Sequence, residues 1–416
     1  MHRSLTARLQ ALFLFSGIIL VLIYALGSDA VVTAAYQGRS LPLLNRLMEN
    51  SAMHPLAFYL RKSDNFTLYL AFLWLCSGLA WGLGARRLRQ PGARRVQAGD
   101  GVVFVLCLAA VYVFLVRYGH EGAWYSLEKI MAYAGNPPFQ HRVMFVVPAR
   151  SLQALFPTLD AVSCFLGAQV LAAALALWAV KRFASLFIRA DMAFVSQLLL
   201  VAVWAPTQRY FTFYDIGIMF VFSFCLYHLL RQEFRPYLLM LTLGTFNHET
   251  TLFLIAGSAV LFYRRMELPK LALFLVLQLV LHGLVRVFLF YCLPANAAWE
   301  GGKVPYNLFL LTERRLDLLL NLGPSIVWFC AAALGWRHAP RELRCCAVVL
   351  PCLLVMTFLV GQLQEARQFD AFLPIAVALF CCAIARWCSA LPEAPLLRMR
   401  PLNRAGSNAL AKEAPI

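Results

Sequence analysis

A block of four polar residues, Asn247–Thr250, interrupts an apolar run that extends from Tyr237 to Tyr263. The block places a carboxylate, Glu249, beside an imidazole, His248. A charged group at membrane depth costs about 2.5–3.5 kcal/mol even on lenient insertion scales, so such residues usually line a cavity and act there. The sequence therefore predicts a functional site at this block.

Other ionisable residues lie near the ends of apolar runs. They include His141 and Arg142, Asp215, His282 and Arg286, Glu365 and Arg367. His282 and Arg286 are spaced i, i+4 and should share a helix face, one or two turns below the outer end of their span. Arginine binds phosphate through two N–H groups, and a carboxylate can act as a general base toward a hydroxyl. This combination predicts an anionic, phosphate-bearing ligand, and a lipid-linked one could approach from the bilayer.

Structural roles for the same residues stay open at this point. These are a Glu249–His248 hydrogen-bonded pair, an N-terminal cap for Asp215, interfacial charges for Glu365 and Arg367, and an Arg286 side chain that snorkels to the interface. Chance would scatter polar groups over both ends of the spans. Here one end carries mainly Lys and Arg, which favours a shared site at the other end.

The composition indicates a polytopic membrane protein. The 416 residues are 61% hydrophobic and 14% charged, with a net charge of +17 and a mean hydropathy of +0.69. The positive charges lie in short loops between apolar runs, where they orient a chain in a membrane. We therefore expect the lipid bilayer, and no nucleic acid, as a partner. Most cysteines fall inside apolar stretches, and their spacing predicts no disulfide framework and no cysteine metal site.

Apolar runs long enough to span a bilayer predict an all-α fold with about 12 membrane-crossing helices. The runs lie near 11–27, 67–84, 101–117, 160–180, 191–207, 211–230, 237–263, 269–293, 317–336, 345–361 and 371–388. Arginines flank both ends of the 237–263 run. We therefore expect it to turn back at the polar block as a hairpin of two half-helices, tolerated only against protein or water. The alternative, a single crossing, reverses the charge bias of every later loop.

This topology predicts one transmembrane domain over 1–388, with both termini cytoplasmic and a disordered tail over 389–416. Two long loops, 28–66 and 118–159, then face outward. The segment Val143–Pro148 is too short to span, so we expect it to be re-entrant or to lie on the membrane surface. No internal repeat is evident.

Three short motifs resemble those of bacterial multi-pass glycosyltransferases of type C, or of a GT-C-like fold. Phe139–Met144 followed by Pro148 resembles the family's F-Q-Y-R-x-L…P signature, Asn247–Thr250 resembles N-R-E-T, and Glu365–Phe369 followed by Pro374 resembles E-x-R…P. The motifs occur in the family's order. The chain departs from the pattern at His141 and His248, where the family commonly has Tyr and Arg.

The resemblance implies an inverting transfer of a sugar from a polyprenyl-phosphate donor to a glycan, lipid or protein on the outer face of the cytoplasmic membrane. It implies an external carboxylate as base, for which Glu121 and Asp29 both qualify, Glu121 being preferred. Arg142, Arg286 and Arg367 would hold phosphate, and the sugar site would be formed by Glu249, His248, Asp215 and Glu365, with His141, Asn247 and His282 as further binding residues.

Other functions stay open. A polysaccharide polymerase or ligase would use two lipid-diphosphate substrates in the same cavity. A transporter of lipid-linked glycans would need broken helices near the midplane, usually paired by an internal repeat. No metal-binding motif is present and no cofactor is assigned; dependence on a divalent metal is left open, as are partners in envelope polysaccharide biosynthesis.

Overall fold

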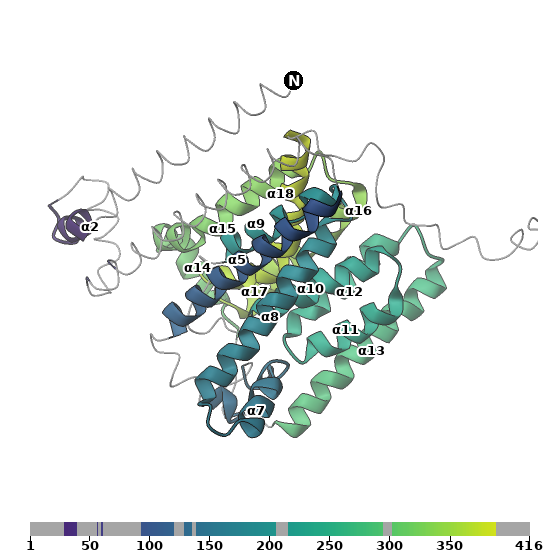
Figure 1. Ribbon diagram of the computed structural model, residues 1–416, viewed down its shortest axis with the longest axis horizontal. Coiled ribbons are helices and arrows are strands. Elements are labelled where there is room, and N and C mark those ends of the chain that lie inside the picture. The colour runs from purple at the N-terminus through teal and green to yellow at the C-terminus, as the bar shows by residue number, and fades with distance from the viewer. Residues whose placement is uncertain are drawn as a thin grey trace, which may run out of the picture.

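The computed structural model describes residues 29–39, 56, 60, 93–119, 129–134, 139–204, 215–293 and 302–387. These residues are mostly helical and contain no β-strand, in agreement with the predicted all-α class. The longest helices are α5 (Ala93–Gly119), α8 (Ala161–Ala184), α13 (Leu268–Cys292) and α15 (Arg315–Gly335). Figure 1 shows the helices gathered in one bundle, with the short helix α2 (Asp29–Tyr36) to its side.

The centre of the bundle is formed by α8, α9 (Val195–Trp204), α10 (Asp215–Leu230) and α18 (Leu373–Trp387). The Asp160 side chain caps α8, because its carboxylate accepts hydrogen bonds from the Ser163 N–H at 2.7 Å and from the Ser163 hydroxyl at 3.0 Å. Almost every residue of α10 is buried. A helix that is apolar on all sides belongs inside a large assembly of helices rather than at its surface.

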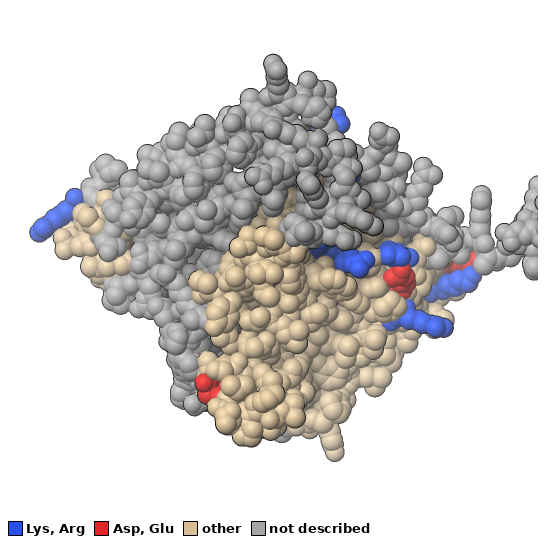
Figure 2. Space-filling model, in the orientation of Figure 1, with Lys and Arg blue, Asp and Glu red and all other residues tan. Residues whose placement is uncertain are grey.

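Among the described residues, four helical stretches are long and apolar enough to cross a membrane: 161–184, 268–292, 341–360 and 366–387. Shorter apolar helices accompany them. Helix α13 exposes large apolar side chains such as Leu273, Val287 and Phe288. In Figure 2 few of the coloured residues are charged, and most of the visible Lys and Arg lie toward one edge. Exposed apolar side chains on a helix of this length suit contact with lipid. The chain is therefore an all-α membrane protein.

Most predicted apolar runs coincide with helices. The runs near 160–180, 211–230, 269–293 and 371–388 match α8, α10, α13 and α18 within a few residues. The run 345–361 begins earlier in the structure, as α16 (Arg341–Cys346) followed by α17 (Val349–Val360). The predicted spans 11–27 and 67–84 and the predicted tail 389–416 lie outside the described residues.

The predicted hairpin is present. Helix α11 (Phe234–Thr245) and helix α12 (Leu252–Phe262) are joined by the polar block and a short 3₁₀ turn, η4 (Glu249–Thr251). The two ends of the hairpin that lie away from the tip also meet, because the Phe234 and Phe262 rings lie 5.6 Å apart. At the tip, the Thr245 and Thr251 hydroxyls are hydrogen-bonded at 3.0 Å. The chain thus returns to the side from which it entered.

Neither arm of the hairpin can cross a bilayer alone. At 1.5 Å per residue, α11 and α12 are each about 17–18 Å long, against a hydrocarbon core of about 30 Å. His282 contacts the tip and is the fifteenth of 25 residues in α13, so it lies about 21 Å along a helix of about 37 Å. The hairpin tip therefore lies inside the bundle, near the middle of the length of α13.

A buried polar network attaches the hairpin to α13. The Tyr237 hydroxyl of α11 lies 2.5 Å from Gln278 Oε1 of α13, and the Gln278 amide also exchanges hydrogen bonds with Ser258 of α12. Tyr237, Gln278 and Ser258 are completely buried. Because buried polar groups are costly when unpaired, this network specifies how the three helices meet.

The segment that carries the first motif ends against the hairpin tip. After a 3₁₀ turn, η1 (Phe139–His141), the N–H groups of Val143 and Met144 both donate to the Phe246 carbonyl, at 2.8 and 3.2 Å. Helix α7 (Val146–Leu155) follows and packs on α8. The segment predicted to be re-entrant or surface-lying is thus a short turn and helix that reach the tip.

The last motif is held by a buried asparagine. Asn307 lies in α14 (Val304–Thr312), and its amide Nδ2 donates to the carbonyls of Thr357, Phe358 and Gly361 at 2.9–3.2 Å. Its Oδ1 accepts the Leu363 N–H at 3.0 Å. These bonds tie the end of α17 and the loop after it to α14.

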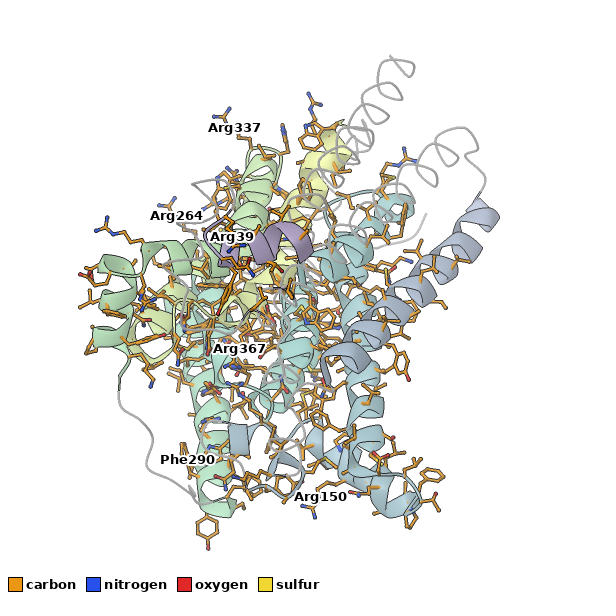
Figure 3. The ribbon with its side chains drawn as sticks, turned by 90° about the vertical axis from the view of Figure 1, so that its left-hand side faces the viewer. Arg39, Arg150, Arg264, Phe290, Arg337 and Arg367 are labelled. Carbon is orange, nitrogen blue, oxygen red and sulfur yellow. The ribbon has the colours of Figure 1, made fainter. Side chains whose placement is uncertain are left out.

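Basic residues mark one end of the bundle. Figure 3 shows Arg264 and Arg337 toward one end, Arg150 and Phe290 toward the other, and Arg367 between them. An ion pair of 2.5 Å between Arg265 and Glu342 joins the hairpin's exit to α16 at the basic end.

Candidate functional site

Four segments that lie far apart in the sequence line one cavity. Its lining residues are Arg142, Asp215, Ile218, His248, Thr250, Arg367, Gln368 and Ala371. They come from the turn before α7, the start of α10, the hairpin tip and the 3₁₀ helix η5 (Ala366–Phe372). All but two of the lining residues carry polar side chains, so the cavity suits a polar ligand.

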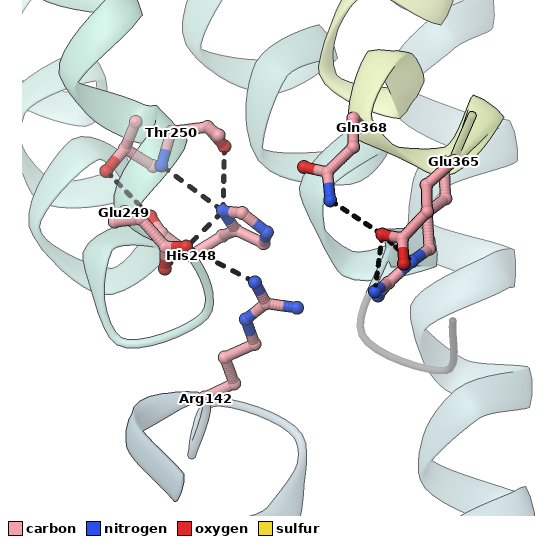
Figure 4. A network of polar contacts seen from close by, with 8 residues as sticks. Arg142, His248, Glu249, Thr250, Glu365 and Gln368 are labelled. Atoms are coloured by element: carbon pink, nitrogen blue, oxygen red, sulfur yellow. Dashed lines mark hydrogen bonds and ion pairs between the residues drawn. The ribbon is translucent and has the colours of Figure 1, made fainter. Parts of the chain in front are cut away.

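Arg142 joins the first motif to the second. Its Nη2 atom lies 3.2 Å from Glu249 Oε1, and the side chains of Arg142 and Glu249 are 6% and 29% exposed. Figure 4 shows the Arg142 guanidinium between the hairpin tip and the group formed by Glu365 and Gln368. A charged hydrogen bond at low exposure is stronger than one in water, so this contact aligns both segments.

His248 serves as the N-cap of η4. Its Nδ1 atom accepts the Thr250 N–H at 3.2 Å, and the Thr250 hydroxyl lies 3.0 Å from the same atom. Because Nδ1 must present a lone pair to an N–H donor, the imidazole is neutral and carries its proton on Nε2. The 3.6 Å approach of Nδ1 to Glu249 Oε2 is then not an ion pair. The carboxylate of Glu249 pairs with Arg142 rather than with its neighbour.

Glu365 and Arg367 form a second ion pair on the other side of the cavity. The Nε and Nη2 atoms of Arg367 lie 3.1 and 2.8 Å from Glu365 Oε2, and Gln368 Nε2 donates to the same oxygen at 2.9 Å. The seven residues after Glu365 form a 3₁₀ helix, which is long for this element and turns side chains at i and i+3 to the same side. Glu365 and Gln368 are brought together in this way.

Asp215 differs from both of these carboxylates. It is the first residue of α10, it lines the cavity and it is 3% exposed. Within the described residues its Oδ2 atom is buried and has no hydrogen-bond partner. It interacts electrostatically with Arg142 and Arg367, and the dipole of α10 stabilises a negative charge at this position.

His282 and Arg286 lie behind the hairpin tip. His282 Nδ1 lies 3.3 Å from the Thr245 hydroxyl and 3.4 Å from the Thr251 hydroxyl. The Arg286 guanidinium lies over the Phe290 ring at 5.3 Å and interacts electrostatically with Glu249. Arg286 is less than two turns from the end of α13, as expected, whereas His282 is almost three turns from it. Neither residue lines the cavity.

Two other residues of the motifs, His141 and Asn247, make packing contacts and do not line the cavity. His141 is 1% exposed, its Nε2 donates to the Leu293 carbonyl at 3.0 Å, and its ring meets Phe290 edge-on. Asn247 is completely buried, and its Nδ2 lies 3.0 Å from the place that a Cβ would occupy at Gly217. His141 thus attaches the first motif to α13, and Asn247 packs against α10.

Glu121 lies outside the described residues. Asp29 begins α2, which Figure 1 shows at the side of the bundle, away from the hairpin; its side chain is not among those described.

Two polar residues that line the cavity, Thr250 and Gln368, were not among the predicted site residues, and neither were the apolar Ile218 and Ala371. Thr250 and Gln368 each follow a charged motif residue directly in the sequence. Their positions in the motifs could have indicated them, since Thr250 is the last residue of the Asn247–Thr250 block and Gln368 lies three residues after Glu365. However, it is the 3₁₀ geometry that turns both side chains toward the cavity.

Within the described part of the chain, no group of three His, Cys, Asp or Glu residues is arranged to hold a metal ion. No family model, curated protein or solved structure matches the chain. The cavity itself offers two guanidinium groups, one neutral imidazole and one carboxylate without a hydrogen-bond partner, so it can bind an anion and hydroxyl groups together and can take up a proton.

Proposed function

We propose that this chain is a membrane glycosyltransferase that moves a sugar from a polyprenyl-phosphate donor to a glycan, lipid or protein. One observation carries the proposal: the three motifs that resemble glycosyltransferase motifs, centred on Arg142, His248 and Arg367, contribute side chains to one cavity. The three motifs lie more than 100 residues apart from one another, so their side chains meet only because the fold places them around the same cavity.

The charges of the cavity suit the two parts of such a donor. A guanidinium has five N–H donors, so an arginine that pairs with a carboxylate can also bind a phosphate oxygen. Arg142 and Arg367 would hold the phosphate, with Arg286 adding positive charge behind the hairpin tip. Glu249, Glu365 and the Nε2–H group of His248 would orient sugar hydroxyls.

The membrane setting supplies the lipid part. A polyprenyl tail can remain in the bilayer beside the apolar helices while its head group enters the bundle. The proposal includes a GT-C-like arrangement of about 12 crossings in the cytoplasmic membrane, with the cavity open to the outside.

The proposal is tested with purified protein in nanodiscs, radiolabelled polyprenyl-phosphate hexoses and a membrane extract as the source of acceptors. Release of polyprenyl phosphate together with a labelled product is expected. Glu249→Gln and Arg367→Ala should slow release at least tenfold, while Lys270→Ala, an exposed change at the basic end, should leave it unchanged. If no donor is turned over, or if both cavity variants match the unmodified chain, the proposal is wrong.

A second candidate is a transporter of an anionic lipid-linked glycan. The position of the hairpin tip near the middle of the length of α13 favours it, because broken helices near the midplane form the binding sites of many transporters. Transport would move the labelled lipid across proteoliposomes without breaking its sugar–phosphate bond, whereas a transferase would release polyprenyl phosphate.

A further inference from the structure

We propose that Asp215 is the group that accepts the proton of the acceptor hydroxyl. The inference rests on the proposed transferase function and replaces Glu121 and Asp29 as the expected base. It follows from a difference among the three carboxylates that the structure brings around the cavity, namely Asp215, Glu249 and Glu365.

Two of the three carboxylates are already engaged. Glu249 is paired with Arg142 at 3.2 Å. One oxygen of Glu365 accepts two N–H groups of Arg367 and one of Gln368, all within 3.1 Å. A carboxylate stabilised by several charged donors is a weak base, because those donors favour its ionised form. Both groups are better suited to positioning than to proton uptake.

Glu249 Oε2 is also buried without a hydrogen-bond partner among the described residues, but Glu249 Oε1 is paired with Arg142. Asp215 differs because neither of its oxygens has such an ion pair in the described part of the chain. Its Oδ2 atom has no hydrogen-bond partner among the described residues although the residue is 97% buried. A buried carboxylate oxygen without a partner is costly unless a ligand completes it. Asp215 lines the same cavity as Arg142 and Arg367, so a hydroxyl that donates to it would lie close to the groups assigned to the phosphate.

The position of Asp215 is tightly determined. Two residues further along α10, Gly217 has no side chain, and the Phe145 ring and the Asn247 amide occupy the space that a Cβ would need. This close approach presses the first turn of α10 against both the segment after Arg142 and the hairpin tip. A base must be held within hydrogen-bond reach of its proton, and this packing provides that constraint.

The step balances without any further reactant. The acceptor oxygen forms a bond to C1 of the sugar as the bond between C1 and the phosphate oxygen breaks, and the polyprenyl phosphate leaves with that electron pair. The acceptor proton passes to the Asp215 carboxylate and is later lost to water.

The experiment compares Asp215→Asn and Asp215→Glu with the unmodified chain, using the polyprenyl-phosphate hexose and the acceptor that the unmodified chain uses. Asp215→Asn should lower kcat roughly 10²–10⁴-fold, while donor binding, measured as protection from thermal unfolding, stays within threefold. Its residual rate should rise about tenfold per pH unit, because hydroxide then takes the proton. Asp215→Glu should recover part of the rate. Asp160→Asn is the matched control, since this exposed cap lies outside the cavity and Asn is also a good N-cap.

The inference is overturned if Asp215→Asn keeps its kcat within threefold, or if it loses donor binding and catalysis equally with an unchanged pH profile. It is also overturned if Glu121→Gln alone produces the loss of kcat and the altered pH profile. Absence of turnover by the unmodified chain is a separate result, which refutes the proposed function and with it this inference.

Discussion

The Nη2 atom of Arg142 lies 3.2 Å from Glu249 Oε1, although the two residues are 107 positions apart in the chain. The ion pair connects the turn before α7 to the tip of a helix hairpin near the middle of the length of α13. Because both side chains are mostly buried, each charge is stabilised by the other.

Removal of one partner of this pair should therefore destabilise the protein more than removal of both. We expect Arg142→Met to lower the unfolding free energy by about 1–3 kcal/mol, the usual cost of an unsatisfied buried group. Arg142→Met combined with Glu249→Gln should regain at least half of that loss. Thermal unfolding in detergent measures both, and a double variant less stable than either single variant would contradict the assigned pairing.

The geometry of Arg367 should matter beyond its charge. Both Nε and Nη2 contact Glu365 Oε2, an arrangement that a lysine ammonium cannot reproduce. Arg367→Lys should therefore reduce turnover at least tenfold. Because it keeps the positive charge, the unfolding free energy should fall by no more than about 1–3 kcal/mol, the cost of an unsatisfied buried group. Equal turnover in Arg367→Lys and the unmodified chain would show that a single positive charge is sufficient.

Asn307 should control the last motif from outside the cavity. Its amide bonds three carbonyls and one N–H around the loop before Glu365. Asn307→Leu should lower the unfolding free energy by about 1–3 kcal/mol and reduce turnover, measured by thermal unfolding and donor release. Thr312→Ala on the exposed face of the same helix is the control. If both variants behave alike, Asn307 does not hold the loop.

The close packing at Gly217 predicts a strong effect of a single methyl group. A Cβ at this position would overlap the Phe145 ring, so Gly217→Ala should destabilise the protein by about 1–3 kcal/mol. Gly257 on α12 has no atom within 4 Å of its Cβ position, and Gly257→Ala should be neutral or stabilising by up to about 1 kcal/mol. Phe145→Leu should partly rescue Gly217→Ala in thermal unfolding; without rescue, the contact is misassigned.

The hairpin predicts which residues share a side of the membrane. Arg235 and Arg264 are exposed at the two ends of the hairpin that lie away from its tip, and Arg150 is exposed toward the opposite end of the bundle. In a background in which Cys76, Cys292, Cys330 and Cys388 are replaced by Ser, Arg235→Cys and Arg264→Cys should react with an impermeant maleimide from one side, and Arg150→Cys from the other. Labelling of the first two from opposite sides would mean that this segment crosses once.

Local sequence determined the helices and the hairpin. Length and hydrophobicity mark an apolar helix wherever it lies, which explains why runs such as 160–180 and 269–293 match helices within a few residues. Arginines on both flanks of 237–263, with a polar block between them, required a turn, because a charged end stays at the aqueous interface and a buried backbone must keep its hydrogen bonds.

Only the tertiary structure decided which polar groups meet and in what state. The neighbours Glu249 and His248 are adjacent in sequence, yet Glu249 pairs with Arg142 and His248 caps a 3₁₀ turn. His141 lies in the same motif as Arg142 but faces Leu293. Among the described residues, Asp215 is the one of the three carboxylates to which no hydrogen bond or ion pair is formed. Such partnerships depend on angstrom-scale packing between segments that lie far apart in the chain, and hydrophobic pattern and motif spacing contain no information at that scale.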